Sequence, residues 1–407
     1  MTKHNRENPF KKWFHLDRYR IGNSLVKSKS ETHTKILDLN CGACGWNTDR
    51  LNVFGVGTNE NLLSEARKAH RLYDYKTAEP HRTGLPGESF DIVTIFERPG
   101  RAAGYDALVK ESFRLLKKGG YCVVSAARGV LPPKKAGKMF RKHGYDIETL
   151  FTLRSLITFL IAKKPGPARK GGGDYSDVSI ILPTLNEGKN IQRMLTFITA
   201  NYRNCAILVS DDGSRDKTKD VVSRFGYKNL VFLDRSGAGV HGLVASVLDA
   251  IRLVATRYFI VIDADGQHPP AKIEDIVNIM RLGSPLVIAS RIAVEDEWSA
   301  FRRMLSYSGA VLGKCVLLLR GKEYISYDIM GGFFGCRKSF WNRCVTRKTE
   351  KTGFRLKGYK LLFDFLKYAP SRLRIEEIYY RFETRKAETS KINIKICLEF
   401  LKSCFLP

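Results

Sequence analysis

The chain has 407 residues, which is long for one domain and suits two domains that each bury a core. Hydrophobic residues at 43% and aromatic residues at 11% argue against a disordered protein. A formal net charge of +28 predicts a negatively charged partner, either nucleic acid, an anionic membrane or a phosphate-rich substrate. No run of about 18 apolar residues occurs, so any membrane contact is expected to be peripheral.

The nine cysteines include one C-x-x-C pair, Cys41 and Cys44. No second C-x-x-C and no histidine-rich segment at zinc-finger spacing accompanies this pair, so a structural zinc site is not expected. We interpret the cysteines as mostly buried, reduced thiols of a cytoplasmic protein.

The first half of the chain alternates short apolar runs with amphipathic stretches, which predicts an α/β fold. Functional loops in such sheets follow the carboxyl ends of the strands. The expected parallel strands are residues 34–39, 53–56, 92–96 and 121–125, and the expected helices between them are residues 60–69 and 105–116.

The run from Lys35 to Gly45 is a predicted strand followed by a glycine-containing turn. It is similar to the first motif of class I S-adenosylmethionine-dependent methyltransferases, and residues 85–93 and 115–121 resemble two later blocks of that family. The resemblance implies a Rossmann-like methyltransferase fold over residues 1–163. The positions that would contact S-adenosylmethionine are Asp38, Gly42 and Gly45.

Several positions depart from the methyltransferase pattern. Asn40 and Cys44 stand where the first motif has glycines, so the backbone is not expected to approach the cofactor closely. Gly57 and Thr77 stand where the family has acidic residues, the first of which binds the ribose hydroxyls. These changes favour a degenerate domain that scaffolds or docks a partner. The alternative is a working methyltransferase with relaxed motifs, in a bifunctional protein.

Residues 164–177 are rich in proline, glycine and charge, as in an exposed linker. Beyond them the α/β pattern resumes and predicts a second domain over residues 178–391, followed by a basic amphipathic tail at 392–407. The expected strands of the second domain are residues 178–182, 206–210, 230–233, 258–262 and 286–289.

Polar residues follow three of these strands. Pro183, Asn186 and Glu187 follow the first, and Asp211 and Asp212 end the second, so both groups are candidates for nucleotide binding at the sheet edge. The run Asp263-Ala264-Asp265-Gly266-Gln267 follows an apolar strand. Its two carboxylates, with the amide oxygen of Gln267, are hard ligands suited to Mg²⁺ or Mn²⁺ beside a nucleotide diphosphate.

These motifs resemble glycosyltransferase family 2, which has the GT-A fold. The Gln-His-Pro-Pro extension at 267–270 looks like the dolichyl-phosphate mannose synthases and their polyprenyl-phosphate relatives. The resemblance implies a nucleotide-sugar site, a metal site and a lipid-phosphate site. The nucleotide-sugar residues are Pro183, Asn186, Glu187, Asp211, Asp212, Asp263, Arg385 and Lys391; the metal ligands are Asp263, Asp265 and Gln267; the lipid-phosphate residues are Arg291, Arg302, Ser306 and Ser390; and those closest to the reaction are Asp265, Arg291, Arg302 and Ser306.

Arg302 and Ser306 are four residues apart, so on a helix they share a face and could hold one phosphate together with Arg291. A solvated basic face is the alternative. Residues 381–391 look like the closing basic strap of the family, although Glu388 stands where glycine is usual. Residues 304–319 are either a helix in the membrane interface or a buried core helix.

The expected reaction is transfer of a sugar to a polyprenyl or dolichyl phosphate with inversion, because an ionised phosphate is its own nucleophile and needs no strong base. Mannose from GDP-mannose is favoured by the Gln-His-Pro-Pro likeness, and UDP-glucose is the alternative donor. We expect a peripheral position on the cytoplasmic face of an anionic membrane, with a membrane-anchoring protein as a further partner. Nucleic-acid binding is disfavoured because no RRM, KH or zinc-finger signature accompanies the charge. A processive polysaccharide synthase is disfavoured because the Q-x-x-R-W signature is absent.

Overall fold

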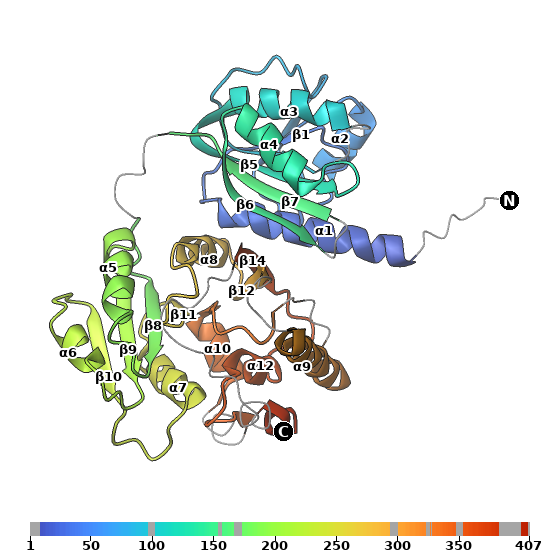
Figure 1. Cartoon of the computed structure of the whole chain (residues 1–407). Coiled ribbons are helices and arrows are strands. Elements are labelled where there is room, and N and C mark those ends of the chain that lie inside the picture. The colour runs from blue at the N-terminus through green and yellow to red at the C-terminus, as the bar shows by residue number, and fades with distance from the viewer. Residues whose placement is uncertain are drawn as a thin grey trace. The chain divides into compact units, whose positions relative to one another are not determined.

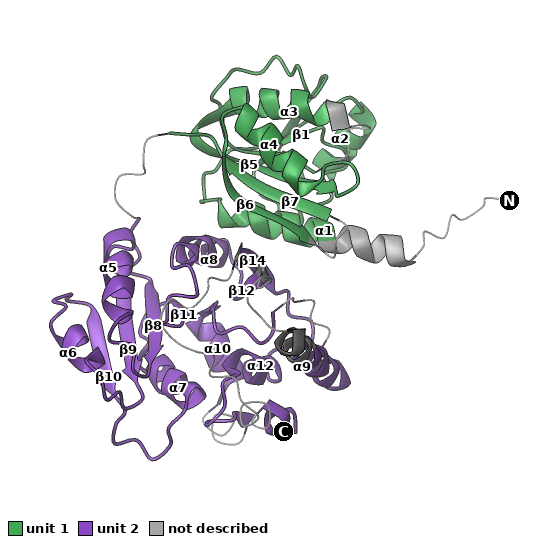
Figure 2. Ribbon diagram, viewed as in Figure 1, with its two compact units in different colours: residues 1–168 green, residues 169–407 purple. Residues whose placement is uncertain are grey.

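The computed structural model describes residues 9–96, 102–153, 157–166, 173–293, 300–322, 326, 328–346, 353–381 and 400–405. The chain divides into two compact units, residues 1–168 and 169–407 (Figures 1 and 2). Both units are α/β, as the sequence predicts, and each is described by itself.

The first unit is built on a seven-stranded sheet with the order β3-β2-β1-β4-β5-β7-β6. The five strands from β3 to β5 are parallel, and β7 is antiparallel to β5 and β6. Because β1 lies between β2 and β4, the strand order reverses at β1, which is where such sheets bind ligands. The elements are α1 (Pro9–Ser28), β1 (Ile36–Leu39), β2 (Val53–Gly57), α2 (Glu60–Lys68), β3 (Asp74–Thr77), β4 (Phe90–Ile95), α3 (Ala102–Leu115), β5 (Leu116–Ala127), α4 (Pro133–Lys142), β6 (Asp146–Leu153) and β7 (Ile157–Lys163).

Helices cover the sheet of the first unit. Leu37 and Leu39 of β1 pack into a core with side chains of α3 and α4, such as Tyr105 and Phe140. Helix α1, not expected from the sequence, packs against β5 and β7, and its Arg18 donates through Nε to Ser125 Oγ at 2.8 Å. All four predicted strands and both predicted helices of this unit are confirmed within a few residues.

The second unit also contains a seven-stranded sheet, with the order β10-β9-β8-β11-β13-β12-β14 (Figure 1). Strand β13 is antiparallel to β11 and β12, and the other pairs are parallel. The carboxyl ends of β8, β9, β11 and β12 therefore meet the start of β13 at one edge. The elements are β8 (Val178–Thr184), α5 (Ile191–Asn201), β9 (Ala206–Asp211), α6 (Thr218–Ser223), β10 (Leu230–Asp234), α7 (Leu243–Leu253), β11 (Tyr258–Val261), α8 (Lys272–Arg281), β12 (Leu286–Ala293), α9 (Ala300–Leu319), β13 (Phe334–Arg337), α10 (Lys338–Cys344), α12 (Leu361–Leu366) and β14 (Glu376–Arg381).

Alternate residues of the central strands enter two separate cores, as the period of a strand dictates. Phe259 and Val261 of β11 join a core with side chains of α7, α10 and α12. Tyr258 and Ile260 of the same strand face the other way, into a core with α5 and α8. The sheet is thus buried on both faces, which explains why its strands read as continuous apolar runs. All five strands predicted for this unit are confirmed.

The connection between the units is shorter than the predicted linker of residues 164–177. Lys164 is buried in the first unit, where its Nζ donates to Leu116 O at 2.7 Å. Tyr175 is buried in the second unit, where its backbone N–H donates to Arg203 O at 2.8 Å. Both ends of the predicted linker are therefore part of a folded unit.

Helix α9 lies at the surface in its described part. Gly313 and Leu317 face the core, whereas Leu318 is 65% exposed and Leu319 is 87% exposed. Over residues 308–319, whose side chains are described, the helix is therefore not buried on all sides. Residues 400–404 are helical, and Phe400 packs against Phe363 with ring centroids 5.3 Å apart. Among the described residues, no helix combines the length and the apolar character needed to cross a membrane.

Candidate active site

The acidic run predicted as a metal site lies directly after β11, at the edge where the strand ends meet. Asp263, Asp265 and Gln267 are each half-buried, and they alternate with the buried Ala264 and the glycine at 266. The backbone N–H of Gln267 donates to Asp265 Oδ1 at 3.0 Å, which forms an Asx turn. The spacing of two residues thus keeps both carboxylates on the accessible side of one tight turn.

A buried histidine positions the first of these carboxylates. His268 Nε2 lies 3.3 Å from Asp263 Oδ2, and His268 Nδ1 lies 2.5 Å from the hydroxyl of Tyr380 on β14. Burial acts to raise the pKa of Asp263, but the hydrogen bond from His268 and the nearby charges of His268, Lys360 and Arg291 lower it below its ordinary value. Asp263 is therefore held as a carboxylate.

Arg291, at the end of β12, is paired with a carboxylate that the sequence did not single out as a site residue. Its Nε and Nη2 donate to the two oxygens of Asp328 at 2.6 and 2.8 Å, a bidentate geometry that fixes the plane of the guanidinium. Burial acts to raise the pKa of Asp328, and the charge of Arg291 and its hydrogen bonds lower it. Tyr380 lies opposite Arg291 in the register of β12 and β14.

A lysine completes the group of charges around the acidic turn. Lys360 precedes α12, and its Nζ donates to Met330 O at 3.2 Å. Burial, assisted by the positive charge of Arg291, lowers the pKa of Lys360 to about 8, against the opposing effect of Asp328 and Asp263. Two cationic and two anionic side chains therefore lie close enough to shift one another's pKa.

The predicted nucleotide-binding residues lie at the ends of β8 and β9, beside the acidic turn in the sheet order. Asp211 is buried, and its carboxylate accepts hydrogen bonds from Thr184 Oγ1 at 2.9 Å and from the backbone N–H groups of Gly213 and Ser214 at 3.2 and 2.8 Å. It therefore shapes the turn after β9, where Gly213 has a φ of +90°.

The neighbouring carboxylate of Asp212 is also held by the protein. It is paired with the guanidinium of Arg235 and accepts from the backbone N–H of Gly242 at 2.7 Å. Asn186, with a φ of +60°, accepts through Oδ1 from the N–H of Arg215 at 2.9 Å. Pro183 is buried within β8, and Glu187 Oε2 accepts from Asn190 Nδ2 at 2.9 Å.

Several predicted phosphate-binding residues fall outside the described side chains. Arg302 and Ser306 lie within the bounds of α9, but their side chains are not described. The strap residues Arg385, Ser390 and Lys391 lie outside the described residues altogether.

Sequence reasoning did not assign His268, Asp328, Lys360 or Tyr380 to the site. His268 has a signal, since it lies within the Gln-His-Pro-Pro run. Asp328 has a weak signal, since it lies shortly before the glycine pair Gly331 and Gly332. Gly332 lets the backbone approach the Asp263 carboxylate, because a Cβ there would lie 3.2 Å from Asp263 Oδ2. Lys360 and Tyr380 carry no local signal, because only the fold brings them to the acidic turn.

Comparison with known proteins matches part of each unit to a family. Residues 179–344 match the family described as Glycosyl transferase family 2. The second unit is a family 2 glycosyltransferase domain. Residues 37–124 match a methyltransferase domain family, which places a methyltransferase-like domain in the first unit.

Curated relatives match the glycosyltransferase region. A dolichol-phosphate mannosyltransferase of Pyrococcus furiosus is 28% identical over 236 residues, which cover 56% of this chain and 62% of that protein. A protein of the same name from Saccharomyces cerevisiae is 25% identical, over 56% of this chain and 85% of that protein. Another, from Mycosarcoma maydis, is 24% identical, over 59% of this chain and 82% of that protein. The chain thus spans less than two thirds of the Pyrococcus protein.

Among solved structures, a TehB-like SAM-dependent methyltransferase of Corynebacterium glutamicum is 15% identical, with a TM-score of 0.31. The similarity covers 39% of this chain and 100% of that one.

The residues of the acidic turn fit a hard divalent cation. Asp263 and Asp265 offer carboxylate oxygens on one turn, Gln267 follows with an amide oxygen, and oxygen ligands are those that Mg²⁺ and Mn²⁺ take. The absence of a side chain at Gly332 keeps Asp263 uncovered on that side. The side chain of Asp263 is 33% exposed, so a ligand can reach it.

The first unit does not fit S-adenosylmethionine in the same way. A Cβ at Gly57, where the family has the ribose-binding acidic residue, would lie 2.4 Å from the carbonyl oxygen of Cys41. The loop after β1 therefore packs onto the end of β2 and leaves no room for that side chain. A Cβ at Gly45 would lie 3.0 Å from the ring of Tyr19, so this glycine accommodates α1.

The other predicted cofactor contacts are also used within the protein. The carboxylate of Asp38 accepts from Trp46 Nε1 at 3.0 Å and from Thr94 Oγ1 at 2.6 Å. Trp46 is fully buried and packs edge-on against Phe96, with ring centroids 5.1 Å apart. Gly42 is half-buried in the same loop. These contacts favour the degenerate domain over a working methyltransferase.

Proposed function

We propose that the second unit transfers mannose from GDP-mannose to a polyprenyl or dolichyl phosphate at a membrane surface. The observation that carries this proposal is the placement of the Asp263 carboxylate, on the same turn as Asp265, near the cationic side chains of Arg291 and Lys360. Such a group can hold two phosphate-bearing substrates at once. The names of the three curated relatives support a dolichol-phosphate acceptor and a mannosyl group.

The proposed reaction requires no general base from the protein. A phosphate monoester is ionised near neutral pH, so its oxygen can attack the anomeric carbon directly as the bond to the nucleoside diphosphate breaks. One displacement of this kind inverts the anomeric configuration. The catalytic contribution is then orientation and charge stabilisation, for which the rigid, bidentate Arg291 is suited.

A divalent cation, when bound, would be held by Asp263, Asp265 and Gln267 and would offset the charge on the leaving diphosphate. His268 and Tyr380 orient Asp263 for this role, because the histidine bonds both to the carboxylate and to the tyrosine hydroxyl.

The surface of α9 supports a lipid acceptor. Leu318 and Leu319, together with Val311 at 43% and Leu312 at 37% exposure, present apolar side chains to solvent. An amphipathic helix with such a face can lie in the interface of a membrane whose anionic lipids attract a protein of net charge +28. The cytoplasmic face, an additional anchoring protein and the roles of Arg302, Ser306, Arg385, Ser390 and Lys391 remain part of the proposal.

The test is transfer from a panel of radiolabelled nucleotide sugars to dolichyl phosphate with Mg²⁺ or Mn²⁺. We expect GDP-mannose to be used, and Asp265→Asn to lose activity by about 100-fold or more because a ligand of the cation is removed. Asp177→Asn, a carboxylate before the start of β8 that pairs with Arg281, is the matched control and should retain activity. Undiminished transfer by Asp265→Asn would overturn the metal assignment, and use of UDP-glucose alone would replace the donor.

A further inference from the structure

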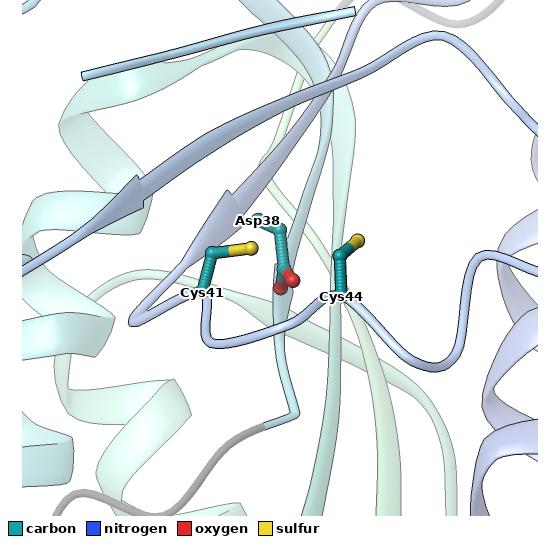
Figure 3. Close-up of side chains that lie close together, drawn as sticks. All are labelled: Asp38, Cys41 and Cys44. Atoms are coloured by element: carbon teal, nitrogen blue, oxygen red, sulfur yellow. The ribbon is translucent and has the colours of Figure 1, made fainter. Parts of the chain in front are cut away.

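A cluster of metal-ligand type lies in the first unit, apart from the glycosyltransferase domain. Asp38 lies on β1, and Cys41 and Cys44 lie on the loop that follows it. A carboxylate oxygen and the two sulfur atoms lie within 4.8 Å of one another, and all three residues are buried. Figure 3 shows the carboxylate between the two cysteine side chains.

The loop holds the two thiols in place through its backbone. Asn40 and Cys44 have φ values of +59° and +46°, the left-handed conformation that the glycines of the parent motif would adopt freely. A non-glycine residue in this conformation destabilises the backbone by about 1 kcal/mol or more, so it is found where surrounding contacts fix the backbone in place. Here Cys41 N–H donates to Val56 O at 2.7 Å, and Asn47 N–H donates to Cys44 O at 3.1 Å.

The carboxylate is oriented by neighbouring donors, as metal-ligating carboxylates are. Trp46 Nε1 donates to Asp38 Oδ2, and the hydroxyl of Thr94 donates to Oδ1. These two donors, one on each oxygen, fix the plane of the carboxylate.

We propose that Asp38, Cys41 and Cys44 bind one zinc ion, which locks the loop at the position where the methyltransferase fold would bind its cofactor. Two sulfur ligands favour zinc over magnesium or manganese, and one oxygen ligand is compatible with it. In tetrahedral zinc sites, sulfur ligands at about 2.3 Å from the metal lie roughly 3.8 Å apart, so the cluster needs only a small contraction.

Binding converts both thiols to thiolates and releases two protons, so the ion would face three negative ligands, with one position left for water. The site has three protein ligands where a closed structural zinc site has four. Its expected effect is still to hold the loop, because the three residues are buried and the loop packs on the end of β2. The cluster escaped the sequence prediction because zinc sites there were sought as a second C-x-x-C or a histidine pair. The third ligand is instead Asp38, three residues before the first cysteine, which the sequence motif assigned to S-adenosylmethionine.

The experiment uses the full chain, expressed in medium supplemented with zinc or with cobalt, because buried ligands are best loaded during folding. Metal content is measured per chain, and the cobalt form is examined for thiolate-to-cobalt charge-transfer absorption. Oxygen ligands such as those of the acidic turn give no such band. We expect the wild-type chain to show the band and to hold about one zinc ion more than the variant with Cys41→Ser and Cys44→Ser.

Cys122→Ser is the matched control, because Cys122 is fully buried in the same unit and lies outside the cluster. It should keep the metal and the band. Trp46→Phe removes one donor to Asp38 and should weaken zinc binding by about tenfold or more, which tests the site even if the double variant fails to fold. A wild-type chain without the cobalt band, or one in which Cys41 and Cys44 form a disulfide under reducing purification, would overturn the proposal.

Discussion

Lys360 offers the sharpest test of the active site, because keeping its ammonium group charged there lowers the free energy of unfolding. Its pKa is lowered from 10.5 to about 8, mainly by burial. At about 1.36 kcal/mol for each unit, the charged form is disfavoured in the folded chain by up to about 3 kcal/mol. Since the side chain is only half-buried, we expect Lys360→Met to stabilise the protein by about 1 to 3 kcal/mol at pH 7.

The pH dependence has a definite sign. The folded pKa of Lys360 lies below its unfolded value, so between about pH 8 and 10.5 the unfolded chain retains a proton that the folded chain has released. Wild-type stability therefore rises with pH in this window, and the cost is fully present below about pH 8. The advantage of Lys360→Met should be constant below that pH and should shrink above it.

The assay is thermal and urea unfolding from pH 7 to 10, with Lys357→Met as the control. Lys357 is exposed and lies three residues before Lys360, so its substitution should change stability little. The same Lys360→Met variant should lose sugar transfer by tenfold or more, since a cation beside two phosphates is removed. A variant that is less stable than wild type, or whose advantage does not change with pH, would refute the account.

Two further predictions concern the ion pair of Arg291 and the loop after β1. Asp328→Asn leaves Arg291 without its carboxylate and should lower the free energy of unfolding by about 3 kcal/mol, measured by urea unfolding. Because the pKa of Asp328 is lowered in the folded state, the difference between wild type and variant should shrink as pH falls through the folded-state pKa. A difference that stays constant at acid pH would contradict this prediction. Gly57→Asp restores the acidic residue of active methyltransferases, yet its Cβ would lie 2.4 Å from a backbone oxygen. The variant should unfold at lower temperature and show no S-adenosylmethionine binding by calorimetry, and binding would show that the loop can move away.

Local patterns predicted most of what lies along one stretch of chain. The apolar runs gave correct positions for the predicted strands of both sheets, because strands buried on both faces must be apolar throughout. The strands that were not predicted are β3, β6, β7, β13 and β14. Strand β3 has no buried residue, so it has no apolar run to detect. The acidic turn was also predictable, since Asp263 and Asp265 are two residues apart and follow β11 directly.

The sequence by itself determined two α/β regions, the position of the acidic turn after a strand, and the loss of acidic and glycine residues from the methyltransferase motifs. Only the tertiary structure paired Arg291 with Asp328, 37 positions away, and His268 with Tyr380, 112 positions away. It also turned Asp38 toward Cys41 and Cys44. The physical reason is that parallel strands bring their carboxyl ends to one edge, so residues that are remote in sequence share one electrostatic environment.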